Sequence, residues 1–236
     1  QVPLKWALQH SNNWISASLI TTLGPQQFVG ILHDFGLNNP DIDRNATPVL
    51  SLGPCEVSVG EMVSAYTAFA NGGVRCAPLF VTKIEDSHGN VIAKFQPLMT
   101  EVISEDNSYR MIDMMRAVID GGTGSRLKGA YGMKGDICGK TGTTNSNSDG
   151  WFIAFTPELV SGAWVGGEDR DIHFDSTSLG QGAAAALPIW AYFMKKVYAD
   201  HQLGYSDKPQ FAIPKDFDFC STSEDTDVND IQEVYF

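Results

Sequence analysis

Two neighbouring apolar segments limit what this chain can fold into. Residues 151–155 and 159–165 are apolar at nearly every position, and the turn-forming Thr156-Pro157-Glu158 separates them. A strand with one face in water alternates apolar and polar residues, so two uninterrupted runs predict a hairpin that is covered on both faces. Helices must supply these covers. The sequence therefore predicts an α/β (α+β) fold in which helices cover both faces of an antiparallel sheet.

The other elements are predicted from hydrophobic spacing and from turn-forming residues. Apolar residues three and four apart, with caps and breaks at their ends, indicate helices. These helices are expected at residues 4–10, 14–35 (interrupted at Gly24-Pro25), 58–70, 104–120 (with Ser104 as N-cap) and 183–201 (with Pro188 near its start or at a kink). A second hairpin is expected from residues 80–85 and 91–95, a further strand at 136–144, and a loop at 37–55.

Length and charge favour one domain with an acidic end. A chain of 236 residues with 43% apolar content can bury one sizeable core, so we expect a single domain over residues 1–215. The net charge is -12, and residues 216–236 hold acids but no Lys or Arg, which predicts a flexible acidic tail. No cluster of Lys and Arg is present to bind phosphates, so nucleic acid is not expected as a partner.

Cysteine spacing predicts neither a metal site nor a definite disulfide. Cys55, Cys76, Cys138 and Cys220 form no Cys-x-x-Cys pair and have no His at ligand spacing, so no metal or other cofactor is expected. A disulfide between Cys55 and Cys76 is conceivable, but the helix expected between them would hold its flanks apart.

The sequence also holds no run of about 18 apolar residues and no signal peptide. Any membrane anchor would lie outside this chain.

A lysine, two hydroxyls and a glycine lie together in the strand predicted at 136–144. Side chains alternate between the faces of a strand, so Thr141 and Thr143 point to one side and Lys140 to the other. Two neighbouring hydroxyls on an edge strand can hold a carboxylate, and Lys140 adds positive potential. Gly142 leaves room for a substrate backbone to lie along the strand. Taken alone, the triplet is more typical of an ordinary edge strand.

Ser11 and Asn13 lie two residues apart in a polar turn between two predicted helices. Their hydroxyl and amide could therefore face one cleft. A helix cap is the simpler interpretation of these residue types, and both roles can hold at once.

The combination is more specific than its parts. Ser11-Asn12-Asn13 followed by Lys140-Thr141-Gly142 resembles the second and third signature elements of the serine penicillin-recognising enzymes, whose first element is Ser-x-x-Lys. The residues at 56–73, 122–124 and 139–157 make residues 4–197 similar to the transpeptidase domain of class A penicillin-binding proteins, the bifunctional glycosyltransferase/transpeptidases of peptidoglycan synthesis. The resemblance implies a β-lactamase/transpeptidase-like fold whose N-terminal part is absent from this chain.

The first signature element has no convincing match. Only Ser125-Arg126-Leu127-Lys128 fits Ser-x-x-Lys, but it follows the Ser11 element instead of preceding it and lies in a Gly-rich stretch. We interpret it as a chance match. The nucleophilic serine and its lysine are therefore expected upstream of Gln1, and this chain alone is expected to be inactive.

The resemblance implies a role for each matching residue in a D,D-transpeptidase that cross-links stem peptides through a serine acyl-enzyme. Ser11 would relay a proton to the leaving amine, and Lys140 would polarise Ser11. Asn13 would bind the donor amide, while Thr141 and Thr143 would hold the terminal carboxylate beside Gly142. The backbone N–H of Thr143 would form half of the oxyanion hole.

The resemblance also implies partners and a location. Peptidoglycan stem peptides would serve as D-Ala-D-Ala donor and amine acceptor, and β-lactam antibiotics would acylate the serine. The parent protein would be membrane-anchored and would act in the bacterial cell envelope, on the periplasmic face of the inner membrane.

Two alternatives remain at the level of sequence. One is a D,D-carboxypeptidase or β-lactamase of the same superfamily, which would use water in place of an amine. The other is a non-catalytic penicillin-binding sensor module.

Overall fold

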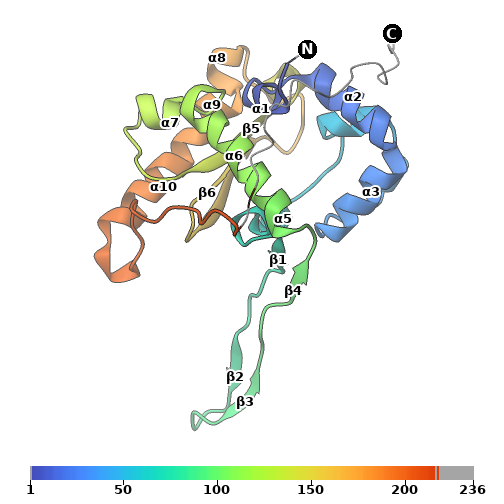
Figure 1. The fold of residues 1–236 in the computed structure, drawn as a ribbon. Helices are drawn as coiled ribbons and strands as arrows, with labels where there is room; N and C mark the ends of the chain where they lie inside the picture. The colour runs from blue at the N-terminus through green and yellow to red at the C-terminus, as the bar shows by residue number, and fades with distance from the viewer. Residues whose placement is uncertain (1, 216, 218–236) are drawn as a thin grey trace.

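The computed structural model describes residues 2–215 and 217 of the chain. Its helices pack around a three-stranded sheet, and two smaller two-stranded sheets extend away from this body (Figure 1). The acidic tail expected at 216–236 lies outside the described residues, apart from Phe217.

The helices, with 3-10 turns written η, are α1 (Leu4–Gln9), α2 (Asn13–Leu23), α3 (Pro25–Asp34), α4 (Pro40–Arg44), η1 (Pro48–Leu52), α5 (Val59–Ala70), α6 (Glu105–Gly121), α7 (Arg126–Gly129), η2 (Asn145–Asn147), α8 (Thr177–Gly180), α9 (Gly182–Ala185), α10 (Leu187–Ala199) and η3 (His201–Leu203). The strands are β1 (Val74–Cys76), β2 (Lys83–Glu85), β3 (Val91–Lys94), β4 (Met99–Glu101), β5 (Cys138–Thr143), β6 (Asp149–Phe155) and β7 (Val160–Gly166).

The three-stranded sheet has the antiparallel order β5-β6-β7, which leaves β5 at an edge. Its register pairs Lys140 with Ile153, Thr141 with Phe152 and Gly142 with Trp151. Because side chains alternate along each strand, Lys140, Ile153 and Trp151 share one face, whereas Thr141 and Phe152 share the other. The predicted separation of Lys140 from Thr141 is confirmed.

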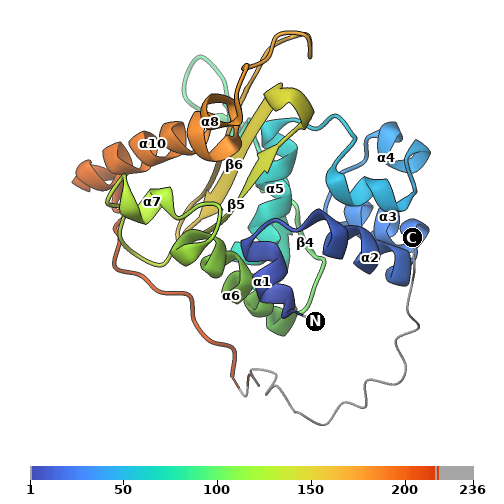
Figure 2. The same cartoon turned by 90° about the horizontal axis from the view of Figure 1, so that it is seen from above.

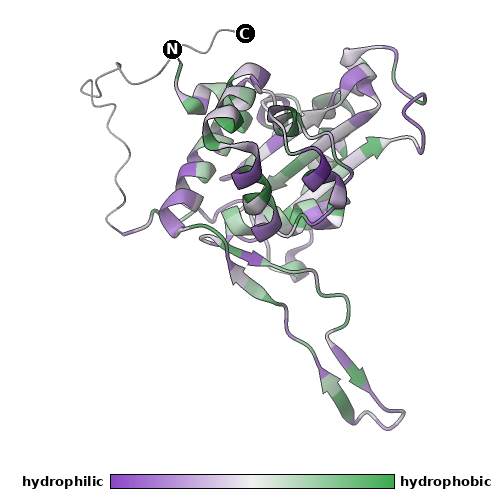
Figure 3. Ribbon diagram, turned by 90° about the vertical axis from the view of Figure 1, so that its right-hand side faces the viewer, coloured by the Kyte–Doolittle hydropathy of each residue, from purple (hydrophilic) through white to green (hydrophobic). Residues whose placement is uncertain are grey.

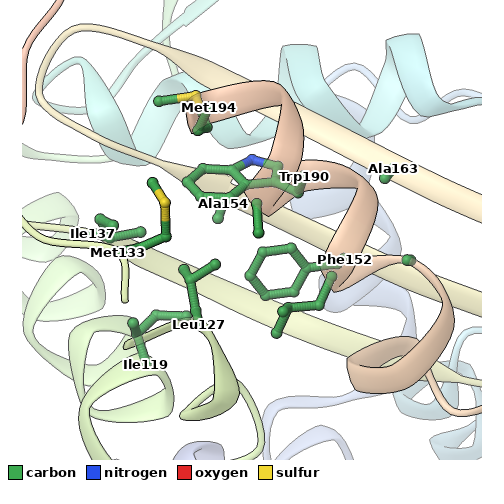
Figure 4. Packing of buried hydrophobic residues seen from close by; sticks show 12 residues of the cluster. Ile119, Leu127, Met133, Ile137, Phe152, Ala154, Ala163, Trp190 and Met194 are labelled. Atoms are coloured by element: carbon green, nitrogen blue, oxygen red, sulfur yellow. The ribbon is translucent and has the colours of Figure 1, made fainter. Parts of the chain in front are cut away.

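One face of this sheet is tightly packed. Phe152 and Ala154 of β6 lie against Trp190 and Met194 of α10, and Leu127 of α7 closes the cluster from the side (Figure 4). The Phe152 and Trp190 rings meet edge to face, with centroids 5.7 Å apart. This layer supplies the helical cover that the apolar strands require on one side.

Helix α5 covers the opposite face. Gly162 of β7 lets this helix approach closely, because a Cβ there would lie 3.1 Å from Val63 and 3.4 Å from Val59. The helix begins with a capping box, in which Ser58 and Glu61 satisfy each other's backbone N–H groups. Helices therefore cover both faces of the sheet, as predicted.

A narrow arm projects from this body. It consists of the β1–β4 pair and, beyond it, the β2–β3 hairpin (Figures 1 and 3). Its side chains are largely solvent-exposed, including Phe80 at 92% and Ile92 at 68%. The β2–β3 hairpin was predicted from the sequence, whereas the β1–β4 pair was not.

The loop expected at residues 37–55 is wrong in part, because the structure contains α4 and η1 there. Asn39 caps α4 by accepting the N–H of Asp41, and prolines occupy the first turns of α4 and η1. Each short helix buries one apolar residue, Ile42 and Leu50 respectively. Turn-forming residues here start helices instead of excluding them.

The helix expected at 183–201 is divided. It forms α9 and α10, with Pro188 in the first turn of α10, where a missing N–H costs no hydrogen bond.

Candidate active site

Ser11 lies in a strained turn between two helices. Helix α1 ends at Gln9, Asn12 caps α2 by accepting the N–H of Ile15 at 3.1 Å, and Ser11 between them adopts a φ of 53°. A positive φ is uncommon for a residue with a Cβ and persists where its surroundings enforce it. The turn directs the Ser11 hydroxyl toward β5.

Lys140 meets Ser11 across 129 positions of sequence. Its Nζ donates to Ser11 Oγ at 2.8 Å and to the Thr141 carbonyl oxygen at 2.8 Å. No carboxylate forms an ion pair with Lys140 among the described residues, and burial lowers the pKa of Lys140 to about 8. Near neutral pH, this amine can therefore both give and accept a proton.

Thr123 supports β5 from the turn after α6. Its hydroxyl and that of Thr141 lie 2.7 Å apart, and its N–H donates to the carbonyl of Gln9. Gly122 is needed for this approach, because a Cβ there would lie 2.4 Å from the Gln9 carbonyl oxygen. The turn at 122–124 thus joins the end of α1 to the middle of β5, which sets Ser11 opposite Lys140.

Gly142 and Thr143 complete the edge strand. A Cβ at Gly142 would lie 3.0 Å from Trp151 Cβ, so a side chain there would press on the tryptophan. The Thr143 hydroxyl is exposed and accepts the N–H of Gly182 at 3.0 Å, where α9 begins. Strand β5 is thus held by α9 at Thr143 and by the turn after α6 at Thr141, while its outer edge stays open.

A cavity of about 640 Å³ lies between the sheet, α5 and the α3–η1 region. Residues 140–144 form one wall. The opposing apolar walls include Phe28, Leu32, Leu50, Met62 and Tyr66. Burial raises the pKa of the Tyr66 phenol to about 12, so it stays protonated. The site is therefore a largely apolar hollow with Lys140 and the backbone edge of β5 on one side.

Asn13 and Ser125 are placed differently from the Ser11–Lys140 pair. Asn13 begins α2, and its exposed side chain forms no hydrogen bond within the described part of the chain. Ser125 lies at the start of α7, and the nearby Lys128 forms an ion pair with Asp120.

Within residues 2–215 and 217, no group of three or more His, Cys, Asp or Glu side chains could hold a metal ion. Cys55, Cys76 and Cys138 are free thiols, so the conceivable Cys55–Cys76 disulfide is not formed. No helix in the same ranges is long and apolar enough to span a membrane.

Known proteins resemble the chain in sequence. The family model described as "Penicillin binding protein transpeptidase domain" matches residues 1–165. The chain belongs to this family. It is 36% identical over 199 residues to penicillin-binding protein 1A of Aquifex aeolicus. The aligned region covers 83% of this chain and 26% of that protein. It is 32% identical over 203 residues to penicillin-binding protein 1A of Neisseria lactamica, covering 82% and 24% respectively. The chain therefore spans about a quarter of the length of these relatives.

Solved structures agree with this assignment. Penicillin-binding protein 1A from Haemophilus influenzae superposes with a TM-score of 0.78 at 25% identity, covering 91% of this chain and 36% of that one. Penicillin-binding protein A from M. tuberculosis, solved as an imipenem acyl-enzyme complex, gives a TM-score of 0.66 at 20% identity, covering 82% and 47%. The latter likeness concerns the fold alone. The predicted fold class is confirmed.

Sequence reasoning did not assign roles to Thr123 and Tyr66. The Gly122-Thr123-Gly124 run was noticed only as part of the family pattern, although two glycines around a hydroxyl indicate a tight approach to another backbone. Tyr66 has the spacing of a core residue on α5, and nothing in the sequence distinguishes a cavity wall from a filled core.

Proposed function

We propose that this chain forms one wall of the active site of a peptidoglycan D,D-transpeptidase that works through a serine acyl-enzyme. The observation that supports this most strongly is the hydrogen bond between Lys140 and Ser11, two residues of separate motifs that meet at a cavity edge. The transpeptidase portion would span residues 1–215, with 216–236 as a tail.

In the proposed reaction a serine Oγ gives its proton to the lysine of its own Ser-x-x-Lys element and attacks the penultimate D-alanyl carbonyl of a stem peptide. The C–O bond forms and the peptide C–N bond breaks. The serine's proton passes through the Ser11 hydroxyl to the amine of the leaving D-alanine, while Lys140 donates a hydrogen bond that polarises Ser11. An amine of a second stem peptide then takes the acyl group, and the serine oxygen recovers its proton.

The remaining residues would bind the donor. Its backbone would lie along the open edge of β5 past Gly142, with its terminal carboxylate near the hydroxyls of Thr141 and Thr143 and its amide near Asn13. The backbone N–H of Thr143 would donate to the oxyanion that forms during attack. A β-lactam would occupy the same place and acylate the same serine.

The nucleophile is proposed to come from a segment outside this sequence. The Ser-x-x-Lys match at Ser125 has its lysine paired with Asp120. The cavity beside Lys140 has the apolar walls that would accommodate a helix, and a serine on such a helix would face Ser11 and Lys140. The assembled protein would be anchored in the membrane and act on the periplasmic side.

Covalent labelling tests this proposal. Two proteins are compared by intact-mass measurement after incubation with benzylpenicillin: this chain, and the longer protein that joins it to its serine-bearing segment. We expect one adduct on the longer protein and none on this chain. Lys140→Ala in the longer protein should slow acylation about 100-fold or more, since proton-transfer groups contribute that much.

Two results would overturn the proposal. One is a longer protein that is never acylated. The other is stoichiometric acylation of this chain that Ser125→Ala abolishes, which would identify Ser125 as the nucleophile.

A further inference from the structure

Beyond Gly142 the cavity changes from apolar to aromatic and acidic. Trp151 of β6 and Trp164 of β7 are cross-strand partners there, with ring centroids 6.4 Å apart. Both line the cavity together with Asp149. Trp164 is 39% exposed, although tryptophan is usually well buried. An aromatic pair is thus left open on the same side of the sheet as Lys140.

Asp149 is held in place by neutral donors. Its Oδ1 accepts the indole N–H of Trp164 at 2.9 Å, and its Oδ2 accepts the Thr144 hydroxyl at 3.1 Å. The Ser148 hydroxyl is 3.4 Å from the same Oδ2. No Lys, Arg or His forms an ion pair with Asp149 within the described ranges. Its negative charge is therefore oriented but not neutralised by a direct partner.

The other charged groups that line the cavity do not change this balance. Lys140 donates to Ser11 and to the Thr141 carbonyl. Glu168 and Arg170 also line the cavity, and neither forms an ion pair among the described residues. Glu56 lines the cavity as well, so its acids (Glu56, Asp149 and Glu168) exceed its cations (Lys140 and Arg170) by one charge, which favours a cationic ligand.

An oriented carboxylate beside two tryptophans recognises one kind of group well. A primary ammonium can form a charge-assisted hydrogen bond with the carboxylate and a cation–π contact with an indole face. A neutral amide or an anion gains neither. The ligand class indicated by these side chains is therefore an alkylammonium.

The position of Asp149 suits the second substrate. Its partner Thr144 has an extended backbone and directly follows Thr143, the last residue of β5, whose N–H is the proposed oxyanion donor. Successive residues in extended backbone lie about 3.3 Å apart. We propose that Asp149, Trp151 and Trp164 form a subsite that binds the ammonium group of the acceptor stem peptide beside the acyl carbonyl. The substrate role rests on the proposed function, whereas the ammonium binding does not.

Binding can be measured on this chain by the indole N–H resonance of Trp164, which reports on its bond to Asp149. The probe is Nα-acetyl-lysine methylamide, and its Nε-acetylated form is the uncharged control. We expect a saturable shift with the charged probe and a shift at least fivefold smaller with the control. Asp149→Asn should abolish the response, whereas the matched loop variant Asp171→Asn should keep it.

Trp151→Leu provides an independent variant, because it removes an aromatic face without touching the bonds to Asp149. It should weaken binding of the charged probe severalfold. Equal responses to the two probes, or full binding by the Asp149 and Trp151 variants, would overturn the subsite.

The substrate role is measured in the longer, serine-bearing protein as the ratio of acyl transfer to an amine over acyl transfer to water. Asp149→Asn should lower this ratio at least fivefold relative to Asp171→Asn. An unchanged ratio would contradict the acceptor role. Absence of acylation in every variant would instead overturn the proposed function, and the NMR titration decides the ammonium subsite in either case.

Discussion

The two faces of the β5–β6–β7 sheet are covered to different extents. On one face, Phe152 is fully buried and Trp190 is 1% exposed. On the other, α5 covers only part of the sheet (Figure 2). The cavity of about 640 Å³ extends along residues 140–144. The same strands thus have a packed face and an open one.

This difference shows how one edge strand can be both rigid and reactive. Thr141 points to the packed side and bonds to Thr123, while Lys140, one residue earlier, points to the cavity. Strand alternation therefore lets the packed face fix the backbone whose other face carries the chemistry. Burial at the edge of the cavity keeps Lys140 from bulk water, and the edge of β5 beside it stays open.

The largest difference is expected from truncating one tryptophan on each face. Trp190→Ala should lower the free energy of unfolding by about 3–5 kcal/mol, since it leaves a cavity in a close-packed cluster. Trp151→Ala should cost about 1 kcal/mol or less, because its ring borders space that is already open. Urea unfolding followed by circular dichroism gives both values. Similar costs for the two would show that the faces are equally packed.

A smaller effect is expected from removing an ion pair beside the start of β5. Asp136 receives two hydrogen bonds from Arg116, at 2.7 and 2.8 Å, and one from the N–H of Phe211. Asp136→Ala leaves the arginine without its partner and should cost about 3 kcal/mol. Asp120→Ala breaks the exposed pair with Lys128 and should cost less than about 1 kcal/mol. Thermal unfolding of both variants under the same conditions gives the two losses of stability. Equal losses would show that Asp136 does not anchor the start of β5.

The smallest effect is expected in a sheet with neither face covered. Ile92 in the β2–β3 hairpin is 68% exposed, so Ile92→Ser should change the free energy of unfolding by about 0.5 kcal/mol or less. Guanidinium unfolding measures this change. A loss above about 2 kcal/mol would mean that the arm contributes to the core.

Local sequence patterns predicted much of this fold because those elements depend on neighbouring residues. The break at Gly24-Pro25, the Ser104 cap and the strand pair around Thr156-Pro157-Glu158 all lie within one or two turns of the element that they define. The β1–β4 pair was missed because its register joins Val74 to Glu101 across an intervening hairpin. The short helix α4 was missed because Asn39 and Pro40 occur in loops and at helix starts alike.

The candidate site was likewise hard to predict where it depends on contacts between segments that are far apart in the sequence. The Ser11 and Lys140 motifs were recognised by family resemblance, and their contact is a long-range fact that no spacing reveals. The sequence did predict the opposite orientations of Lys140 and Thr141, because alternation is local. It did not predict the Thr123 bond or the cavity, since both depend on how α6, α5 and the sheet pack together.

The ionisation of Lys140 tests the central claim, that the open face of β5 holds this lysine desolvated beside Ser11. Folding that lowers its pKa from 10.5 to about 8 means that the unfolded chain binds more protons between these values. The contribution of Lys140 to stability should therefore rise with pH in this window, so the stability of this chain should rise relative to that of Lys140→Met.

The direct measurement is an NMR titration of the Lys140 side chain in this chain, assigned with the Lys140→Met variant. The structure predicts a midpoint near pH 8. A midpoint near 10.5, with the same pH dependence of stability in both proteins, would contradict the claim.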